Sequence, residues 1–220
     1  MKVNPKVVDL YHGDTGSLKG GAIDWAALKG AGIVGVIHKA SQGTTDIDPQ
    51  YAARRKAATA AGLLWGAYHF GTSADGGQQA KHFLSAAQPD KDTLVAIDFE
   101  DFVSEMTLAG LQAFIEGIHT ALGRFPVLYS GNLIKEKIAG RSQESKMFFA
   151  QCRFWLAQYG STPRLIDSDN VALPWKDAWL WQFTGDGAGP QPHTIPGLHG
   201  DIDISSFNGT DEELATQWAD

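Results

Sequence analysis

A unit of helix, glycine and apolar strand recurs along this chain, and it limits the fold more than any other feature. Residues 23–31 have helical spacing, and Gly32 ends that helix before the apolar run 33–37. The same order returns in two further places, at 51–61, Gly62 and 63–70, and at 108–122, Gly123 and 126–130. Helices that alternate with apolar strands are typical of βα units and predict a parallel sheet.

The number of strands predicts how this sheet is arranged. Eight apolar segments are expected as strands: 7–10, 33–37, 63–70, 94–99, 126–130, 154–159, 178–183 and 202–204. The last three are separated by Gly-, Pro- and Asp-rich segments instead of long helices. We therefore expect an α/β fold, a single irregular TIM-type (β/α) barrel with five regular βα units followed by three strands with little helix between them. An open doubly wound sheet would need a Gly-rich phosphate turn after the first strand, and residues 10–14 do not contain one.

Composition narrows the function classes. The chain has 220 residues and a net charge of -7, so we expect one domain over residues 1–220 and no nucleic-acid partner, because such partners require a basic surface. No run of apolar residues is long enough to span a membrane, and the first eight residues do not form a signal peptide, so we expect synthesis in the cytoplasm. The single cysteine, Cys152, is expected to be a buried apolar residue, and the chain is expected to be a monomer.

Polar residues at the carboxyl ends of the strands are the candidate site, because the active site of a parallel barrel lies there. They share one property, which is that each ends a predicted strand. These residues are Asp9, Lys39, Tyr68, His69, Asp98, Glu100, Tyr129, Gln158, Tyr159, Gln182, Asp201 and Asp203.

The strongest local signal is the pair Asp98 and Glu100. Residues two apart on a strand project to the same face, about 6.6 to 7 Å apart, so both carboxyl groups should face the barrel interior. Mutual repulsion and partial burial should raise the pKa of one of them, and a carboxylic acid that stays protonated can protonate a glycosidic oxygen. The alternative is a solvated acidic loop, since Asp101 and Glu105 follow.

Other residues leave two interpretations open. Asp9 could cap a turn or position a substrate, and the pair Asp201 and Asp203 could be a polar strand edge or part of a site. The histidines lack metal-ligand spacing, so no metal and no cofactor are expected. Tryptophans gather in the last third of the chain, where Trp155 could stack on sugar rings or pack in the core.

An ordered set of short motifs resembles glycoside hydrolase family 25, the Chalaropsis-type lysozymes or N-acetylmuramidases of bacteria, fungi and phage endolysins. The motifs cover nearly the whole chain at compatible spacings. They are Val8-Asp9 with Gly13, Ile23-Asp24-Trp25, Ala31-Gly32-Ile33, 39–43 (KASQG), 66–70 (GAYHF), Asp98-Phe99-Glu100, Tyr129-Ser130, 155–159 (WLAQY), Trp181-Gln182-Phe183 and Ile202-Asp203.

The resemblance implies cleavage of the β-1,4 bond between N-acetylmuramic acid and N-acetylglucosamine of peptidoglycan. It implies Glu100 as general acid/base, Asp98 as the group that assists the 2-acetamido group, and Asp9 and Asp203 as the rest of an acidic cluster. Substrate contacts are expected from Lys39, Tyr68, His69, Tyr129, Trp155, Tyr159, Gln182 and Asp201. The residues after Asp9 depart from the family pattern, which leaves the shape of one cleft wall open.

The resemblance also sets expectations about partners and place of action. The partner would be a peptidoglycan glycan strand, and the enzyme would act on the cell wall after release or dedicated export. No separate wall-binding domain is expected. Two alternatives remain open, a chitinase-like or endo-N-acetylglucosaminidase activity and a catalytically inactive glycan-binding barrel.

Overall fold

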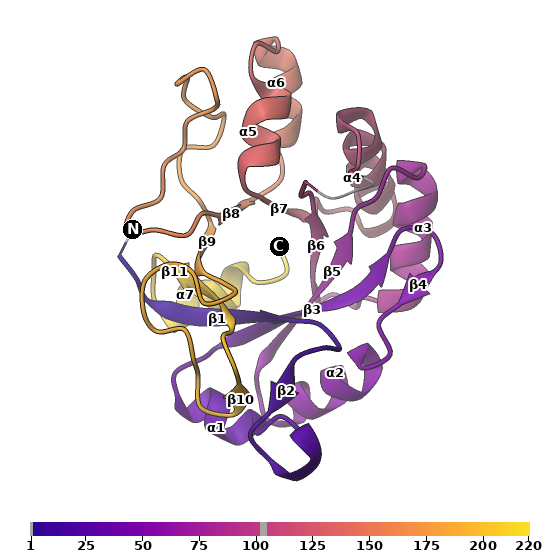
Figure 1. Ribbon diagram of the computed structural model, residues 1–220. Helices are drawn as coiled ribbons and strands as arrows, with labels where there is room; N and C mark the ends of the chain where they lie inside the picture. Colours follow the sequence, from indigo (N-terminus) through magenta and orange to yellow (C-terminus); the bar gives the residue numbers. More distant parts are fainter. Residues whose placement is uncertain (1, 102–104) are drawn as a thin grey trace.

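The computed structural model describes residues 2–101 and 105–220, which form a closed barrel of eight strands (Figure 1). Pairing of the first strand with both its parallel neighbour and the last strand closes the sheet. The barrel strands are β1 (Pro5–Leu10), β3 (Gly35–Gln42), β5 (Leu64–Phe70), β6 (Leu94–Asp98), β7 (Val127–Ser130), β8 (Phe154–Ala157), β9 (Leu180–Thr184) and β11 (Asp203–Phe207). Three short strands lie outside it: β4 (Asp46–Ile47) beside β3, and β2 (Thr15–Gly16) paired with β10 (Leu198–His199).

Helices follow the first five barrel strands and surround that part of the barrel (Figure 1). They are α1 (Trp25–Gly30) after the 3-10 turn η1 (Lys19–Gly21), α2 (Tyr51–Ala60), α3 (Gly76–Ala87), α4 (Leu108–Leu122), and the pair α5 (Asn132–Ile138) and α6 (Gln143–Phe149). Asp24 and Thr107 cap α1 and α4 by accepting backbone N–H bonds, and Gly123 ends α4 in the left-handed conformation. Within the described residues no helix separates β8, β9 and β11, so the irregular barrel is confirmed.

The direction of the last strand corrects the expectation of a wholly parallel sheet. β11 runs antiparallel to both β1 and β9. The connection from β9 contains β10, which pairs with β2 just beyond the carboxyl end of β1. The chain therefore stays near the mouth of the barrel and enters β11 from that side. Its first residue, Asp203, lies at the mouth although it begins the strand instead of ending it.

Side-chain alternation divides the core into two layers. Ile97 and Phe99 are fully buried between the sheet and the helices, whereas Leu94 and Ala96 point into the barrel. The interior layer continues with Val7, Ile37, Val127, Leu180 and Phe207. These apolar residues fill the lower part of the barrel, and Cys152 is buried as expected.

The C-terminal helix α7 (Asp211–Gln217) closes the amino-terminal end of the barrel. Trp218 donates its indole N–H to the carbonyl of Trp65 at 2.8 Å. Its ring packs so closely on Gly35 that a Cβ added there would lie 2.4 Å from a ring carbon. Arg124 and Arg153, which precede β7 and β8, donate to backbone carbonyls of residues 217–220. With that end closed, the carboxyl ends of the strands form the open mouth.

In the part of the chain that the structure describes, none of the helices is both long and apolar enough to cross a lipid bilayer.

Candidate active site

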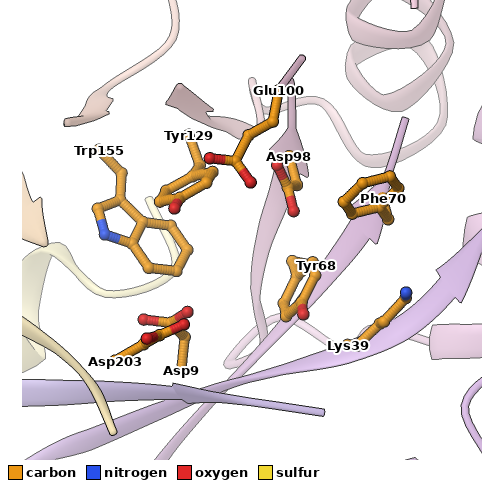
Figure 2. A pocket seen from close by; sticks show the side chains of 9 residues that line it. All are labelled: Asp9, Lys39, Tyr68, Phe70, Asp98, Glu100, Tyr129, Trp155 and Asp203. Carbon is orange, nitrogen blue, oxygen red and sulfur yellow. The ribbon is translucent and has the colours of Figure 1, made fainter. Parts of the chain in front are cut away.

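Side chains from seven barrel strands, together with Glu100, meet in a pocket of about 170 Å³ at the mouth (Figure 2). They are Asp9, Lys39, Tyr68, Phe70, Asp98, Glu100, Tyr129, Trp155 and Asp203. Eight of these nine were expected from the sequence. The strands thus bring together residues separated by almost 200 positions, which places four carboxyl groups around one small space.

Asp98 and Glu100 form the upper pair of carboxyl groups in Figure 2. Asp98 ends β6 and is buried, and Glu100 lies two residues beyond it, on the same side of the chain. Burial and then the charge of Glu100 raise the pKa of Asp98 well above its usual range, and Lys39 partly opposes this. Burial also raises the pKa of Glu100, and the neighbouring hydroxyl of Tyr129 acts in the opposite direction.

One oxygen of Asp98 has an unmet hydrogen-bonding capacity. Among the described residues, Oδ1 of Asp98 is a buried side-chain oxygen without a hydrogen-bond partner. Leaving such a group unpaired costs about 1–3 kcal/mol. The oxygen belongs to a residue that lines the pocket, so a donor on a bound molecule could satisfy it.

Asp9 and Asp203 form the second pair, and their side chains lie next to each other in Figure 2. They are opposite one another in the antiparallel register of β1 and β11. Burial and then Asp203 raise the pKa of Asp9 well above its usual range. Burial, with the neighbouring charges of Asp186 and Asp14, raises the pKa of Asp203 to about 7. Each charge in this cluster opposes the ionisation of the next, so the four carboxyl groups titrate as a coupled set with raised pKa values.

A hydrogen-bond chain joins the two sides of the pocket floor. Tyr129 donates its hydroxyl proton to Oε1 of Gln182 at 2.8 Å, and Nε2 of Gln182 lies 3.1 Å from both carboxyl oxygens of Asp9. Trp155 donates its indole N–H to Oγ of Ser205 at 2.8 Å and packs edge to face with Tyr129, the ring centroids 4.6 Å apart. These contacts fix both aromatic rings, so the floor is preorganised for a ligand.

Lys39 forms the opposite wall. Its Nζ lies 4.8 Å from the centre of the Phe70 ring and donates to Oε1 of Gln42 at 2.5 Å. Burial lowers the pKa of Lys39, and the charge of Asp98 acts against this shift. The pairing register between β3 and β5 shifts between Lys39 and Ser41, which changes which side chains of β3 face the pocket.

The structure places four expected contact residues outside this pocket. The expectation that His69 contacts the substrate was wrong. Its ring points toward the helices, where it forms hydrogen bonds with Ser41 and Gln79 and stacks on Phe114. Gln182 is fully buried beneath the pocket and reaches it only through its partners. Asp201 is exposed and away from the pocket lining. Tyr159 borders an adjoining cleft of about 350 Å³ that also contains Glu100.

Two residues near the acids were not anticipated. Phe70 lies two positions after Tyr68 on β5, so strand alternation was a sufficient signal for it. Asp186 lies in the turn after β9 and has a φ of 50°. Its charge raises the pKa of Asp203, and a hydrogen bond from its backbone to the Asp203 carboxyl group lowers the same pKa. Nothing in the local sequence pattern pointed to Asp186.

Over residues 2–101 and 105–220, no group of three or more His, Cys, Asp or Glu side chains is arranged to hold a metal ion. The chemistry that the pocket offers is that of carboxyl groups with raised pKa values beside aromatic rings. Such groups can donate a proton at neutral pH and then accept one, which is the requirement for acid–base catalysis.

The family model of glycosyl hydrolases family 25 matches residues 15–191, which is most of the chain. The chain belongs to this family. A muramidase from Trichobolus zukalii shares the family 25 barrel, with a TM-score of 0.75 and 26% identity over 99% of both chains. A bacterial lysozyme from Streptomyces coelicolor has the same fold, with a TM-score of 0.78 and 24% identity over 99% of this chain and 98% of that one.

Curated relatives of this family 25 chain are longer than it is. Lysozyme M1 of Streptomyces globisporus is 26% identical over 208 residues, which cover 88% of this chain and 66% of that protein. The uncharacterized protein YegX of Escherichia coli O157:H7 is 29% identical over 182 residues, which cover 80% of this chain and 60% of that protein. The chain thus spans about 60% of the length of the YegX protein.

Proposed function

We propose that this family 25 chain is a muramidase that cleaves the β-1,4 bond between N-acetylmuramic acid and N-acetylglucosamine in peptidoglycan. The observation that carries the proposal is the pocket in which Asp98 and Glu100 lie together, with Oδ1 of Asp98 buried and unpaired among the described residues. A 2-acetamido N–H is a donor of the kind that this oxygen lacks.

Glu100 is proposed as the general acid and base. Its raised pKa favours the protonated form, and it is less buried than Asp98, at the junction of the pocket and the adjoining cleft. The protonated carboxyl group would give its proton to the glycosidic oxygen as the bond to the anomeric carbon breaks. The resulting carboxylate would then take a proton from the water that completes hydrolysis.

Asp98 is proposed to assist the 2-acetamido group of the substrate. By accepting its N–H, Oδ1 of Asp98 would orient the acetamido oxygen toward the anomeric carbon, where that oxygen stabilises the positive charge that develops. This route does not need a second carboxylate as nucleophile. Asp9 and Asp203 would add negative potential below the sugar, with Gln182 holding Asp9 in place.

Digestion of purified peptidoglycan, followed by mass spectrometry of the reducing ends, tests this proposal. The wild type is expected to release fragments that end in reducing N-acetylmuramic acid. Glu100→Gln is expected to lower the rate by a factor on the order of 10² to 10⁴, since that is the usual contribution of a general acid. Asp101→Asn, which removes a neighbouring exposed carboxylate, is the matched control and should keep its activity.

Other outcomes would replace the proposal. Fragments that end in reducing N-acetylglucosamine would indicate a glucosaminidase, and cleavage of chitin oligomers alone would indicate a chitinase-like enzyme. Binding of the glycan without cleavage by the wild type would indicate an inactive glycan-binding barrel.

A further inference from the structure

A second cavity, of about 250 Å³, lies beyond the cleft that contains Glu100. It is formed by α5 and the loop that follows β8, which lie side by side in Figure 1. The residues that line it are Asn132, Lys135, Glu136, Gln158, Arg164, Ile166, Asp167 and Ser168. Asn132 and Gln158 also line the cleft beside Glu100, so the two spaces border each other.

Two cations face this cavity without an acidic partner. Lys135 is only 9% exposed, and Arg164 is exposed on the loop. Among the described residues, neither of them forms an ion pair with a carboxylate. Both side chains line the same cavity, and burial and then the charge of Arg164 lower the pKa of Lys135. A buried cation without a carboxylate partner is costly, so an anion bound between Lys135 and Arg164 would stabilise Lys135.

Two acids line the same cavity, Glu136 and Asp167. In the part of the chain that the structure describes, Glu136 is exposed and forms no ion pair with either cation, and Asp167 is already used. Asp167 accepts a bond from Nζ of Lys146 at 3.2 Å, and its other oxygen accepts the backbone N–H groups of Asp169 and Val171. Both side chains of the Lys146–Asp167 pair are almost fully buried. They hold the loop against α6, while the backbone N–H of Arg164 donates to Oε1 of Gln158 at 2.9 Å. The loop that carries Arg164 is therefore fixed before any ligand binds.

We propose that Lys135 and Arg164 form a subsite for a carboxylate on the peptide branch of the glycan. This inference rests on the proposed function, since it concerns a substituent of the same substrate. The chain has a net charge of -7, and four carboxyl groups surround the catalytic pocket, so an anionic branch is repelled from most of the mouth. The cavity that holds Lys135 and Arg164 borders the cleft beside Glu100, and these two cations offer such a branch a favourable place.

Binding to the Glu100→Gln variant, measured by calorimetry, tests the subsite without turnover of the ligand. Three probes share one tetrasaccharide of alternating N-acetylglucosamine and N-acetylmuramic acid. The first carries peptides with free carboxylates, the second carries the same peptides with amidated carboxylates, and the third carries no peptide. We expect the first probe to bind about five to ten times more tightly than the other two, as for a charge-assisted contact at a partly exposed site.

Neutralising the cations should remove this preference. In Glu100→Gln with Lys135→Gln and Arg164→Gln, the three affinities should agree within a factor of about two, and the preference should weaken with salt in the parent protein. Arg164→Gln alone should lose part of the preference. Because this position is exposed, the single variant should fold even if the double variant does not. Lys81→Gln removes an exposed lysine of α3, outside the lining of this cavity, and should keep the full preference.

Several results would overturn the inference. Equal affinities for the three probes, or no binding of any probe while the wild type digests peptidoglycan, would reject it and leave the proposed function intact. Equal affinities for the three probes, combined with loss of probe binding in millimolar inorganic phosphate, would assign a phosphate site instead. A wild type that does not cleave peptidoglycan but prefers the free-carboxylate probe would reject the proposed function and retain the anion site.

Discussion

Removing the negative charge of Asp203 should stabilise the protein at neutral pH. The ordinary pKa of this carboxyl group is 3.8 and its pKa in the folded protein is about 7, because of burial and the nearby charges of Asp186 and Asp14. The folded state therefore holds the proton more tightly than the unfolded state. Stability is lost as the pH rises from about 4 to about 7, and above that window the full penalty applies.

The size of the penalty follows from the shift. A shift of about three units corresponds to about 4 kcal/mol at about 1.36 kcal/mol per unit. Asp203 is partly exposed and shares its protons with the other acids of the mouth, so about half of this, about 2 kcal/mol, is expected. For a chain of this length, 2 kcal/mol corresponds to an increase in Tm of roughly 4–8 °C.

Thermal unfolding of the wild type and Asp203→Asn at pH 4 and pH 8 measures this difference. Asparagine keeps the shape and can still accept a backbone N–H, so the variant should gain stability at pH 8 and little at pH 4. Asp201→Asn, two residues away at an exposed position, is the control and should change stability by less than about 0.5 kcal/mol. An equal gain at both pH values, or a loss at pH 8, would refute the argument from the raised pKa.

Three further changes test the packing that holds the site. Trp218→Ala should destabilise the protein by about 3–5 kcal/mol in urea unfolding, since it empties the closed end of the barrel and removes the bond to the Trp65 carbonyl; a loss below 1 kcal/mol would contradict this role. Gly35→Ala should cost about 1–3 kcal/mol or more in the same assay, because the new Cβ would lie 2.4 Å from the Trp218 ring, and wild-type stability would show that the ring moves freely. Lys146→Met should lower the free energy of unfolding by about 3 kcal/mol, because it leaves Asp167 buried without its cation. Limited proteolysis should then cut the loop after β8 sooner than in the wild type. Equal resistance to proteolysis would count against this ion pair as the anchor of the loop.

Much of the fold followed from local patterns. A glycine followed by an apolar run marked the end of three helices, at Gly32, Gly62 and Gly123, because capping and burial act over a few residues. The sequence also predicted that the last three strands would lack helices between them. It did not predict the direction of β11, since the residue pattern of a short strand is the same for either direction of the chain.

The candidate site divides in the same way. The pair Asp98 and Glu100 could be recognised because strand alternation fixes the relation between two residues of one segment. The same rule could have excluded either Tyr68 or His69, which are adjacent on β5 and face opposite sides, and it could have added Phe70.

By itself, then, the sequence determined the eight barrel strands, the family resemblance and the acid pair at the end of β6, all of which depend on neighbours along the chain. Only the tertiary structure decided that Asp9 and Asp203 face each other across an antiparallel pair of strands, that Asp186 lies near Asp203, and that Lys135 and Arg164 line one cavity. The physical reason is that burial and electrostatic repulsion depend on distances through space. Those distances are set by barrel closure and by the antiparallel entry of β11, which no local pattern specifies.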